Sequence, residues 1–310
     1  MNILIVDEMH DSLLPLLDEL GMEADYFPAF GRKEAEEVIG AYDGLMIRSK
    51  FFIDETFLAR ASRLKFIARA GAGLDLIDLA ACEQRNIRVF AANEANRVAV
   101  AEHLIGMLLN LFNRITPAGA EIREGKWLRE KNRGEELYGK TAGIIGYGHN
   151  GSATAARLAA FGCRVLVYDK YKSGFGTDCI LETDLDTIFK EAEIVSLHVP
   201  LTHETKGWVD AAFFERFSSP VYFCNVARGE IVRQHDLVEA LRSGRVAGAC
   251  LDVLENEKLG TLTPAQREDF DFLTAHERVI LTPHVAGWSR ESYRKINEVL
   301  CKQIAAYQAE

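Results

Sequence analysis

The sequence predicts an α/β protein built from two doubly wound parallel-sheet domains. Short apolar runs typical of buried strands alternate with helical patterns along the chain, and 310 residues are enough for two domains. A glycine-rich turn, which usually follows the first strand of such a sheet, occurs only at Gly146, in the middle of the chain. A separate α/β unit must therefore precede that turn.

The first series of elements occupies the amino-terminal third of the chain. Its expected strands are the apolar runs at residues 2–6, 44–47, 66–69 and 89–91. Helical patterns lie at 11–20, which Gly21 ends, and at 32–39, 55–61 and 74–84. This alternation predicts a parallel sheet covered by helices.

A long helical pattern over residues 96–123 follows, with Pro117 as the expected kink. A charged linker at 124–138 carries Trp127. The second series then begins, with strands expected at 141–145, 164–168, 194–198, 221–225, 246–251 and 279–281, and a helix at 150–161. A final helix is predicted at 290–308.

Composition limits the possible functions. The formal net charge is −10, whereas sequence-independent nucleic-acid binding needs a basic surface. No apolar run is long enough to span a bilayer, and the start lacks the basic region of a signal peptide. The six cysteines form no Cys-x-x-Cys pair, which favours buried thiols in a reducing compartment. We therefore expect a cytoplasmic enzyme or binding protein with no nucleic-acid, membrane or metal partner.

The turn Gly146-x-Gly148-x-x-Gly151 has the context of a dinucleotide site. It follows a predicted buried strand and opens a predicted helix, whose amino terminus offers free N–H groups to a pyrophosphate. The next strand ends in Asp169, where a carboxylate would bind ribose hydroxyls and repel a 2′-phosphate. The turn therefore predicts NAD rather than NADP, although Lys170 and Lys172 lie close to the acid.

Three polar residues follow later strands, at the edge where open α/β sheets place their sites: Arg228, Asp252 and His284. Histidine is the natural proton donor near neutral pH, and a carboxylate such as Glu257 would hold it and raise its pKa. Arginine offers a planar fork to a substrate carboxylate. Taken singly, His284 is more often a capped loop histidine, Arg228 a surface ion pair and Glu257 a solvated acid. In combination with the dinucleotide-binding turn earlier in the chain, they predict hydride transfer to or from a carbonyl.

Together these motifs make the chain resemble the D-isomer-specific 2-hydroxyacid dehydrogenase family over essentially its whole length. The resemblance is carried by residues 136–151, His198-Val-Pro-Leu-Thr202, Asn225-Val-Ala-Arg-Gly229, Asp252-Val253 with Glu257, and Thr282-Pro-His-Val-Ala-Gly287. It implies a Rossmann cofactor domain at 94–287, with the long helix 96–123, inserted into a smaller flavodoxin-like substrate domain at 1–93 plus 288–310. Closure of the two domains would exclude water, and the family implies a homodimer.

The resemblance also implies roles for single residues. Arg228 would bind the substrate carboxylate, His284 would be the acid–base, Glu257 would hold His284, and Asp252 would bind the nicotinamide carboxamide. The implied cofactor-binding residues are Gly146, Tyr147, Gly148, His149, Asn150, Gly151, Asp169, His198, Val199, Pro200, Thr205, Val226, Ala227, Arg228, Asp252, His284 and Gly287. The implied substrate-binding residues are Arg48, Ser49, Arg69, Ala70, Gly71, Ala72, Gly73, Arg228 and His284.

The chain departs from the family pattern in several places. Lys258 replaces the proline that usually follows the catalytic glutamate, and residues 259–277 form a longer, charged segment. The choice of Glu257 over Glu255 therefore rests on spacing from Asp252. The loop at 93–97 is about two residues short. We expect no regulatory extension, and so no feedback by serine.

The pattern is closest to the phosphoglycerate dehydrogenase branch, because Arg48 and Arg69 could bind a phosphate. Arg129, of this chain or of a partner subunit, could add to that site. The first expected reaction is oxidation of 3-phosphoglycerate to 3-phosphohydroxypyruvate, as in serine biosynthesis. The alternative is reduction of an unphosphorylated 2-oxo acid such as glyoxylate or hydroxypyruvate. A remote alternative is an NAD-sensing corepressor that acts through protein partners.

Overall fold

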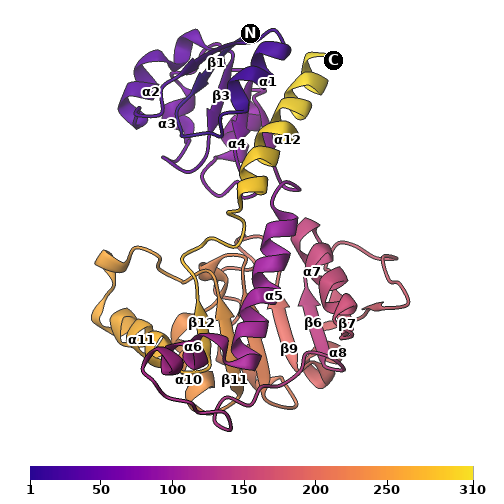
Figure 1. Cartoon of the computed structure of the whole chain (residues 1–310). Helices are drawn as coiled ribbons and strands as arrows, with labels where there is room; N and C mark the ends of the chain where they lie inside the picture. The colour runs from indigo at the N-terminus through magenta and orange to yellow at the C-terminus, as the bar shows by residue number, and fades with distance from the viewer. Residues whose placement is uncertain (310) are drawn as a thin grey trace. The chain divides into compact units, whose positions relative to one another are not determined.

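The structure is a computed structural model that describes residues 1–309, and these divide into two compact units (Figure 1). The first unit contains Met1–Arg97 and the segment from Trp288 onward. The second unit, Val98–Gly287, is inserted between those two pieces. Each unit has its own parallel sheet with its own apolar cores.

The first unit has a five-stranded sheet in the order β2-β1-β3-β4-β5. The strands are β1 (Asn2–Ile5), β2 (Glu23–Tyr26), β3 (Gly44–Ile47), β4 (Phe66–Arg69) and β5 (Arg88–Ala91). The helices are α1 (Leu13–Glu19), α2 (Arg32–Val38), α3 (Glu55–Leu58), α4 (Leu79–Gln84) and the carboxy-terminal α12 (Arg290–Gln308). Neighbouring residues of β1 face opposite sides, since Ile3 packs in the core with α1 and α12, and Leu4 in the core with α2, α3 and α4.

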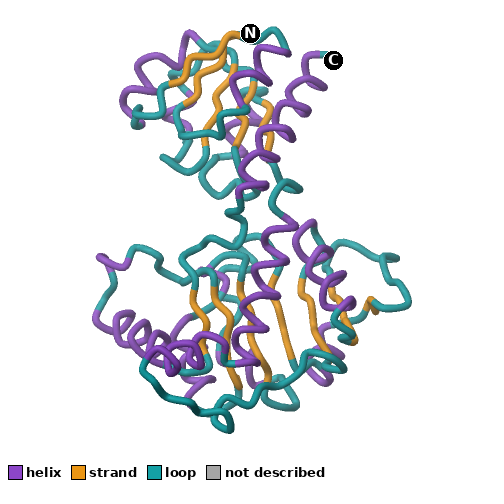
Figure 2. Tube along the Cα trace, viewed as in Figure 1, coloured by secondary structure: helices purple, strands orange, loops and turns teal. Residues whose placement is uncertain are grey.

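The second unit has a seven-stranded sheet in the order β12-β11-β10-β9-β6-β7-β8. Figure 2 shows strands in orange and the helices beside them in purple. The strands are β6 (Thr141–Ile145), β7 (Arg164–Tyr168), β8 (Ile180–Glu182), β9 (Ile194–Leu197), β10 (Val221–Asn225), β11 (Val246–Leu251) and β12 (Val279–Leu281). The helices are α5 (Arg97–Asn113), α6 (Ile115–Arg123), α7 (His149–Ala160), α8 (Leu185–Glu191), α9 (Ala211–Glu215), α10 (Gln234–Arg242) and α11 (Pro264–Ala275). The strand order reverses between β6 and β9, so a crevice is expected at their carboxyl ends.

Helices cover both faces of the larger sheet. α5 and α7 pack on one face, and α8, α9, α10 and α11 pack on the other. Every strand pair in both sheets is parallel. The predicted fold class, two doubly wound parallel-sheet domains, is confirmed.

The long helix expected at 96–123 is two helices in the structure. α5 and α6 meet at an angle of 59°, and between them Arg114 has a positive φ of 51°. Asn110 Oδ1 accepts the Thr116 N–H at 2.8 Å, which stabilises this break. Pro117 lies within the first turn of α6, where a missing N–H costs little. Within residues 1–309 no single helix is long and apolar enough to cross a membrane, and α5 with α6 reach that length only as a bent pair.

Candidate active site

The glycine turn between β6 and α7 has the shape that a pyrophosphate requires. Gly146 has a φ of 99°, and a Cβ there would lie 2.5 Å from the His198 carbonyl oxygen. A Cβ on Gly151 would lie 2.0 Å from the Gly146 oxygen, so helix and strand are in close contact. At Gly148, by contrast, an added Cβ would meet no atom within 4 Å. Gly146 and Gly151 are therefore required for packing, and Gly148 leaves open space at the helix start.

The amino terminus of α7 keeps polar groups available for a ligand. Gly148 is its N-cap and provides no side-chain cap. In the first turn, Asn150 Oδ1 is buried, and within residues 1–309 it has no hydrogen-bond partner. The uncapped start of α7 fits the pyrophosphate of a dinucleotide, since such helix starts supply N–H groups and positive potential.

A cavity of about 480 Å³ lies beside this turn, at the carboxyl ends of β6, β7 and β9. Asp169 is in its wall and accepts the backbone N–H groups of Tyr147 at 2.7 Å, Tyr171 at 2.9 Å and Lys172 at 3.0 Å. Burial raises the pKa of Asp169, but these donors outweigh burial and lower the pKa below its ordinary value. The carboxylate is therefore anionic, as a ribose-binding group should be.

The two lysines beside Asp169 already have partners. Lys172 Nζ donates to the Tyr147 carbonyl oxygen at 2.9 Å, and Lys170 forms an ion pair with Glu204. The charge of Lys170 is thus paired with a carboxylate of the protein, and Lys172 Nζ is held by a backbone carbonyl. This arrangement favours a cofactor without a 2′-phosphate.

The loop after β9 forms the facing wall of the cavity. His198 donates its backbone N–H to Ile145 at 2.7 Å, and its Nε2 lies 3.0 Å from Ser196 Oγ. Burial lowers the pKa of His198 to about 4, so its ring is neutral. Thr205 Oγ1 donates to the Pro200 carbonyl at 2.7 Å and closes the loop. His198, Val199, Pro200 and Thr205 all line the cavity, together with Gly146, Gly148 and Asp169.

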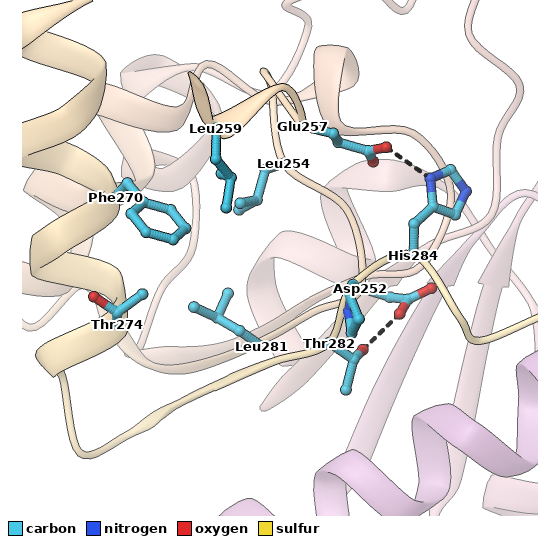
Figure 3. Close-up of a pocket in the computed structure, with 10 residues that line it drawn as sticks. Asp252, Leu254, Glu257, Leu259, Phe270, Thr274, Leu281, Thr282 and His284 are labelled. Atoms are coloured by element: carbon cyan, nitrogen blue, oxygen red, sulfur yellow. Dashed lines mark hydrogen bonds and ion pairs between the residues drawn. The ribbon is translucent and has the colours of Figure 1, made fainter. Parts of the chain in front are cut away.

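The predicted acid–base pair forms in the second unit. His284 follows β12, and its Nδ1 lies 3.0 Å from Glu257 Oε2 (Figure 3). The bond to Glu257 raises the pKa of His284, and burial opposes it only in part. With Nδ1 held by the carboxylate, Nε2 is the atom that can exchange a proton with a substrate.

Spacing alone could not exclude Glu255, but the structure assigns the two glutamates different partners. Glu255 Oε2 accepts the Gln234 N–H at 3.0 Å, at the start of α10. Glu257 is left to bind His284. Lys258 begins the turn into the short 3₁₀ segment Leu259–Thr261, so the proline of the family pattern is not needed to place Glu257.

Asp252 holds the turn that carries His284. Its buried carboxylate accepts Thr282 Oγ1 at 2.5 Å and the N–H groups of Val285 and Ala286 at 2.9 and 2.8 Å. Its backbone oxygen accepts the His284 N–H at 2.8 Å, while His284 has a φ of 55°. The structure therefore gives Asp252 a supporting role beside the cofactor contact that the resemblance implies, and that contact stays a prediction.

His103 is a site residue that the sequence reasoning missed. It lies on α5, and its Nε2 is 3.0 Å from Thr282 Oγ1 and 3.7 Å from Asp252 Oδ1. The sequence feature that could have identified His103 is a histidine on an otherwise apolar helix face. Its partner lies 179 positions away in the sequence, so pattern reasoning could not connect the two.

The turn carrying Arg228 is fixed by Asn225, at the end of β10. The buried Asn225 side chain donates to the Arg228 carbonyl at 3.0 Å and accepts the Ala227 N–H at 3.0 Å. A Cβ on Gly229 would lie 1.8 Å from the Leu254 oxygen, so this turn packs tightly on the loop leading to Glu257. The charge of Arg228 acts on His284, which places the guanidinium near the acid–base pair.

The charged segment at 258–277 forms one wall of an apolar cavity of about 380 Å³ (Figure 3). Leu259 lies in the 3₁₀ segment and Phe270 on α11, and they face Leu254 and Leu281. Glu257 and His284 lie at one end. The acid–base pair thus has apolar packing on one side.

The predicted substrate residues Arg48 to Gly73 lie in the first unit, at the carboxyl ends of β3 and β4. Arg48 and Ser49 donate their backbone N–H groups to Asp7 Oδ2 at 2.7 and 3.2 Å. Arg69 ends β4, and Ala70 donates to the Ile47 oxygen at 2.8 Å. Gly71 has a φ of 154°, and a Cβ there would lie 1.6 Å from Arg69 Nη1. Ala72 and Gly73 follow, half-buried.

Comparison with known proteins gives one consistent picture. Residues 105–286 match the model of the D-isomer specific 2-hydroxyacid dehydrogenase, NAD binding domain. A D-3-phosphoglycerate dehydrogenase of Archaeoglobus fulgidus is 34% identical over 98% of this chain, and a hydroxypyruvate reductase of Thermotoga maritima is 34% identical over 96%. A D-lactate dehydrogenase from Aquifex aeolicus, solved with NAD and lactic acid, superposes with a TM-score of 0.83 at 26% identity, covering 100% of this chain and 96% of that one.

The relatives differ in length. This chain spans 56% of the Archaeoglobus protein and 53% of a D-3-phosphoglycerate dehydrogenase of Synechocystis, so it covers about half of those proteins. It spans 94% of the Thermotoga hydroxypyruvate reductase.

Proposed function

The chain belongs to the D-isomer specific 2-hydroxyacid dehydrogenase family, and on that premise we propose that it transfers a hydride between NAD and a D-2-hydroxy acid or its 2-oxo acid. The observation that carries the proposal is the Glu257–His284 pair, with Nδ1 held at 3.0 Å and Nε2 left for a substrate. It lies in the same unit as the glycine turn and Asp169. Proton donor and NAD site are therefore built on one sheet.

NAD, when bound, would supply or accept the hydride, with its pyrophosphate on the start of α7 and its ribose at Asp169. During reduction, His284 Nε2 gives its proton to the oxygen of the substrate carbonyl. Glu257 stabilises the imidazolium before transfer, and Arg228 provides positive charge for the substrate carboxylate. During oxidation, neutral His284 takes the hydroxyl proton.

Two substrate classes are candidates. The sequence favours 3-phosphoglycerate and 3-phosphohydroxypyruvate, because Arg48 and Arg69 follow neighbouring strands of the first unit and relatives include D-3-phosphoglycerate dehydrogenases. The second class is unphosphorylated 2-oxo acids such as hydroxypyruvate and glyoxylate. It is supported by the Thermotoga hydroxypyruvate reductase, whose length this chain nearly matches.

A homodimer built on the second unit is part of the proposal. α6 and the segment after it expose large apolar side chains, with Ile115 58%, Trp127 83% and Tyr138 75% exposed. Large apolar side chains exposed along one segment are candidates for burial by a second copy of the chain. Light scattering after size exclusion should give twice the chain mass, and a monomer at micromolar concentration would contradict this part.

The test of the function is NADH oxidation by the purified protein with a panel of 2-oxo acids. The proposal expects turnover that depends on both NADH and a 2-oxo acid, with NADPH much less effective. The absence of turnover with every acid, despite tight NADH binding, would contradict it. NADH-dependent capture of a protein partner in that case would revive the corepressor alternative.

A further inference from the structure

The loop that carries Glu257 has Lys258 where the family pattern has proline, so other contacts must fix it. Asn256 Oδ1 accepts the Lys258 N–H at 3.0 Å, and the Glu257 carbonyl oxygen accepts the Leu259 N–H at 3.2 Å. These bonds make a compact turn at residues 256–259, which we call the Glu257 turn. Both bonds lie within the turn, so neither of them fixes it to the rest of the second unit.

Arg267 of α11 connects the Glu257 turn to that helix. Its Nη2 donates to the Leu259 carbonyl oxygen at 2.6 Å, and its Cζ lies 5.5 Å from the ring centroid of Phe270. A hydrogen bond from a charged donor is shorter and stronger than one from a neutral donor, and stacking on the ring favours one orientation of the guanidinium. Leu259 and Phe270 both point into the apolar cavity beside Glu257 (Figure 3). Arg267 therefore joins the two elements that form this wall of the cavity.

α11 is a firm support, because it is capped at its start and packed on the core. Thr263 Oγ1 accepts the Gln266 N–H at 3.3 Å, and Gln266 Oε1 accepts the Thr263 N–H at 3.1 Å, which is a capping box. Leu273 is fully buried among the apolar side chains on this face of the sheet, and Phe272 packs against the same core. The helix thus offers a fixed base from which one side chain can hold the Glu257 turn.

We infer that Arg267 is a positioning residue for the acid–base pair, because its bond to the Leu259 carbonyl keeps the Glu257 carboxylate in place. The inference rests on the proposed reaction and adds a residue that serves its proton donor. The side chains of Glu257 and His284 are 45% and 47% exposed, so burial alone does not hold them 3.0 Å apart. The charged segment at 258–277 then supports Glu257 in place of the missing proline.

The charged groups that act on His284 all belong to the second unit. The hydrogen bond to Glu257 raises the pKa of His284, burial opposes it, and the negative charge of Glu257 adds to the rise. The charge of Arg228 lowers this pKa, and that of Asp252 raises it. A displaced Glu257 would weaken the largest of these effects and leave the other two charges in place. Loss of the Arg267 bond should therefore lower the pKa of His284 without removing any group that touches it.

The test measures the pKa of His284 by an NMR titration of the full chain, labelled with carbon-13 at the histidine Cε1 atoms. The variant His284→Ala assigns the signal. Arg267→Ala should lower the pKa of His284 below the wild-type value, because Glu257 is then held less firmly on the ring. This measurement needs no substrate, so it is independent of turnover.

The kinetic arm uses NADH oxidation with hydroxypyruvate. In Arg267→Ala, kcat for reduction should fall by about threefold or more above neutral pH, and kcat/KM should begin to fall at lower pH than in the wild type. The KM for NADH should stay within about twofold, because the NAD cavity lies at other strands, β6, β7 and β9. Arg267→Lys keeps a cationic donor on an apolar stem and should restore most of the wild-type pH profile.

Arg242→Ala is the matched control. Arg242 of α10 stacks on Phe272 of α11, with its Cζ 4.8 Å from the ring centroid, and this contact does not involve the Glu257 turn. The control should leave the pKa of His284 and kcat unchanged. An equal fall of that pKa in Arg242→Ala and Arg267→Ala would overturn the inference, because general packing of α11 would then explain the effect.

Arg267→Met gives a second variant if Arg267→Ala does not fold. It keeps an apolar stem beside Phe270 and removes the donor to Leu259, so the pKa of His284 should again be lower. A pKa that neither variant lowers would overturn the inference and leave the hydride reaction intact. Failure of the proposed function has a different signature, which is the absence of NADH oxidation with every 2-oxo acid while the titration of His284 is still measurable.

Discussion

The hydrogen bonds of Asp252 make a quantitative prediction for Asp252→Ala. The wild-type carboxylate is 2% exposed and accepts two backbone N–H groups, from Val285 and Ala286, and the Thr282 hydroxyl. Alanine removes the carboxylate that accepts all three hydrogen bonds. Thr282 can keep its contact with His103 at 3.0 Å, but the two N–H groups are left without an acceptor.

The loss of unfolding free energy in Asp252→Ala follows from the N–H groups of Val285 and Ala286. A buried donor left without a partner costs about 1–3 kcal/mol, so the two together should destabilise the second unit by about 3–4 kcal/mol. For a domain of roughly 150–250 residues, each kcal/mol lowers Tm by about 2–4 °C, so we expect a fall of about 10 °C. The turn that positions His284 also loosens, so kcat should fall as well.

Calorimetry identifies the relevant transition, because NADH binding to the second unit raises the Tm of that unit. Asp269→Ala is the matched control. Asp269 is 6% exposed and pairs with His235 at 3.1 Å, but the His235 side chain is 67% exposed and can turn to water. The control should therefore cost only about 1 kcal/mol. If Asp252→Ala lowers the Tm no more than Asp269→Ala does, the supporting role assigned to Asp252 is wrong.

Two further predictions concern the proton and the cofactor. The hydrogen bond to Glu257, together with the negative charge of Glu257, raises the pKa of His284, and Glu257→Gln weakens the first and removes the second. The protonated fraction of His284, and with it kcat/KM for reduction, should therefore begin to fall at lower pH than in the wild type. In the oxidation direction, where His284 must be neutral, activity should persist to lower pH. A pH profile that Glu257→Gln does not move would show that another group controls His284. Asp169→Ala should weaken the binding of NADH and reduce the preference for NADH over NADPH, measured as the ratio of their kcat/KM values. The reason is that the variant loses both the acceptor for the ribose hydroxyls and the charge that repels a 2′-phosphate. An unchanged ratio would mean that another residue distinguishes the ribose of NADH from that of NADPH.

The strand predictions followed the buried apolar runs of the sequence. β6 and β10 agree with their apolar runs residue for residue. β2 was missed because its sequence, Glu-Ala-Asp-Tyr, is a mostly exposed edge strand with no apolar run to mark it. α11 was hidden in the charged segment because it buries few residues, Asp269 and Leu273.

The candidate site was predictable where one strand and its following loop carry the chemistry. The glycine turn with Asp169 follows from such spacing, whereas the choice of Glu257 as the partner of His284 needed the structure. Contacts between distant segments could not be found in the same way. His103 reaches Thr282 from α5, and Arg48 meets Trp288 across most of the chain length. Such contacts depend on the tertiary fold.

The most direct test of the central claim is the kcat of His284→Ala in NADH-dependent reduction, with NADH affinity measured in parallel by fluorescence. If His284 Nε2 delivers the proton, kcat should fall by roughly two to four orders of magnitude while NADH affinity stays nearly unchanged. Turnover equal to that of the wild type would contradict the account, because the proton would then come from another group.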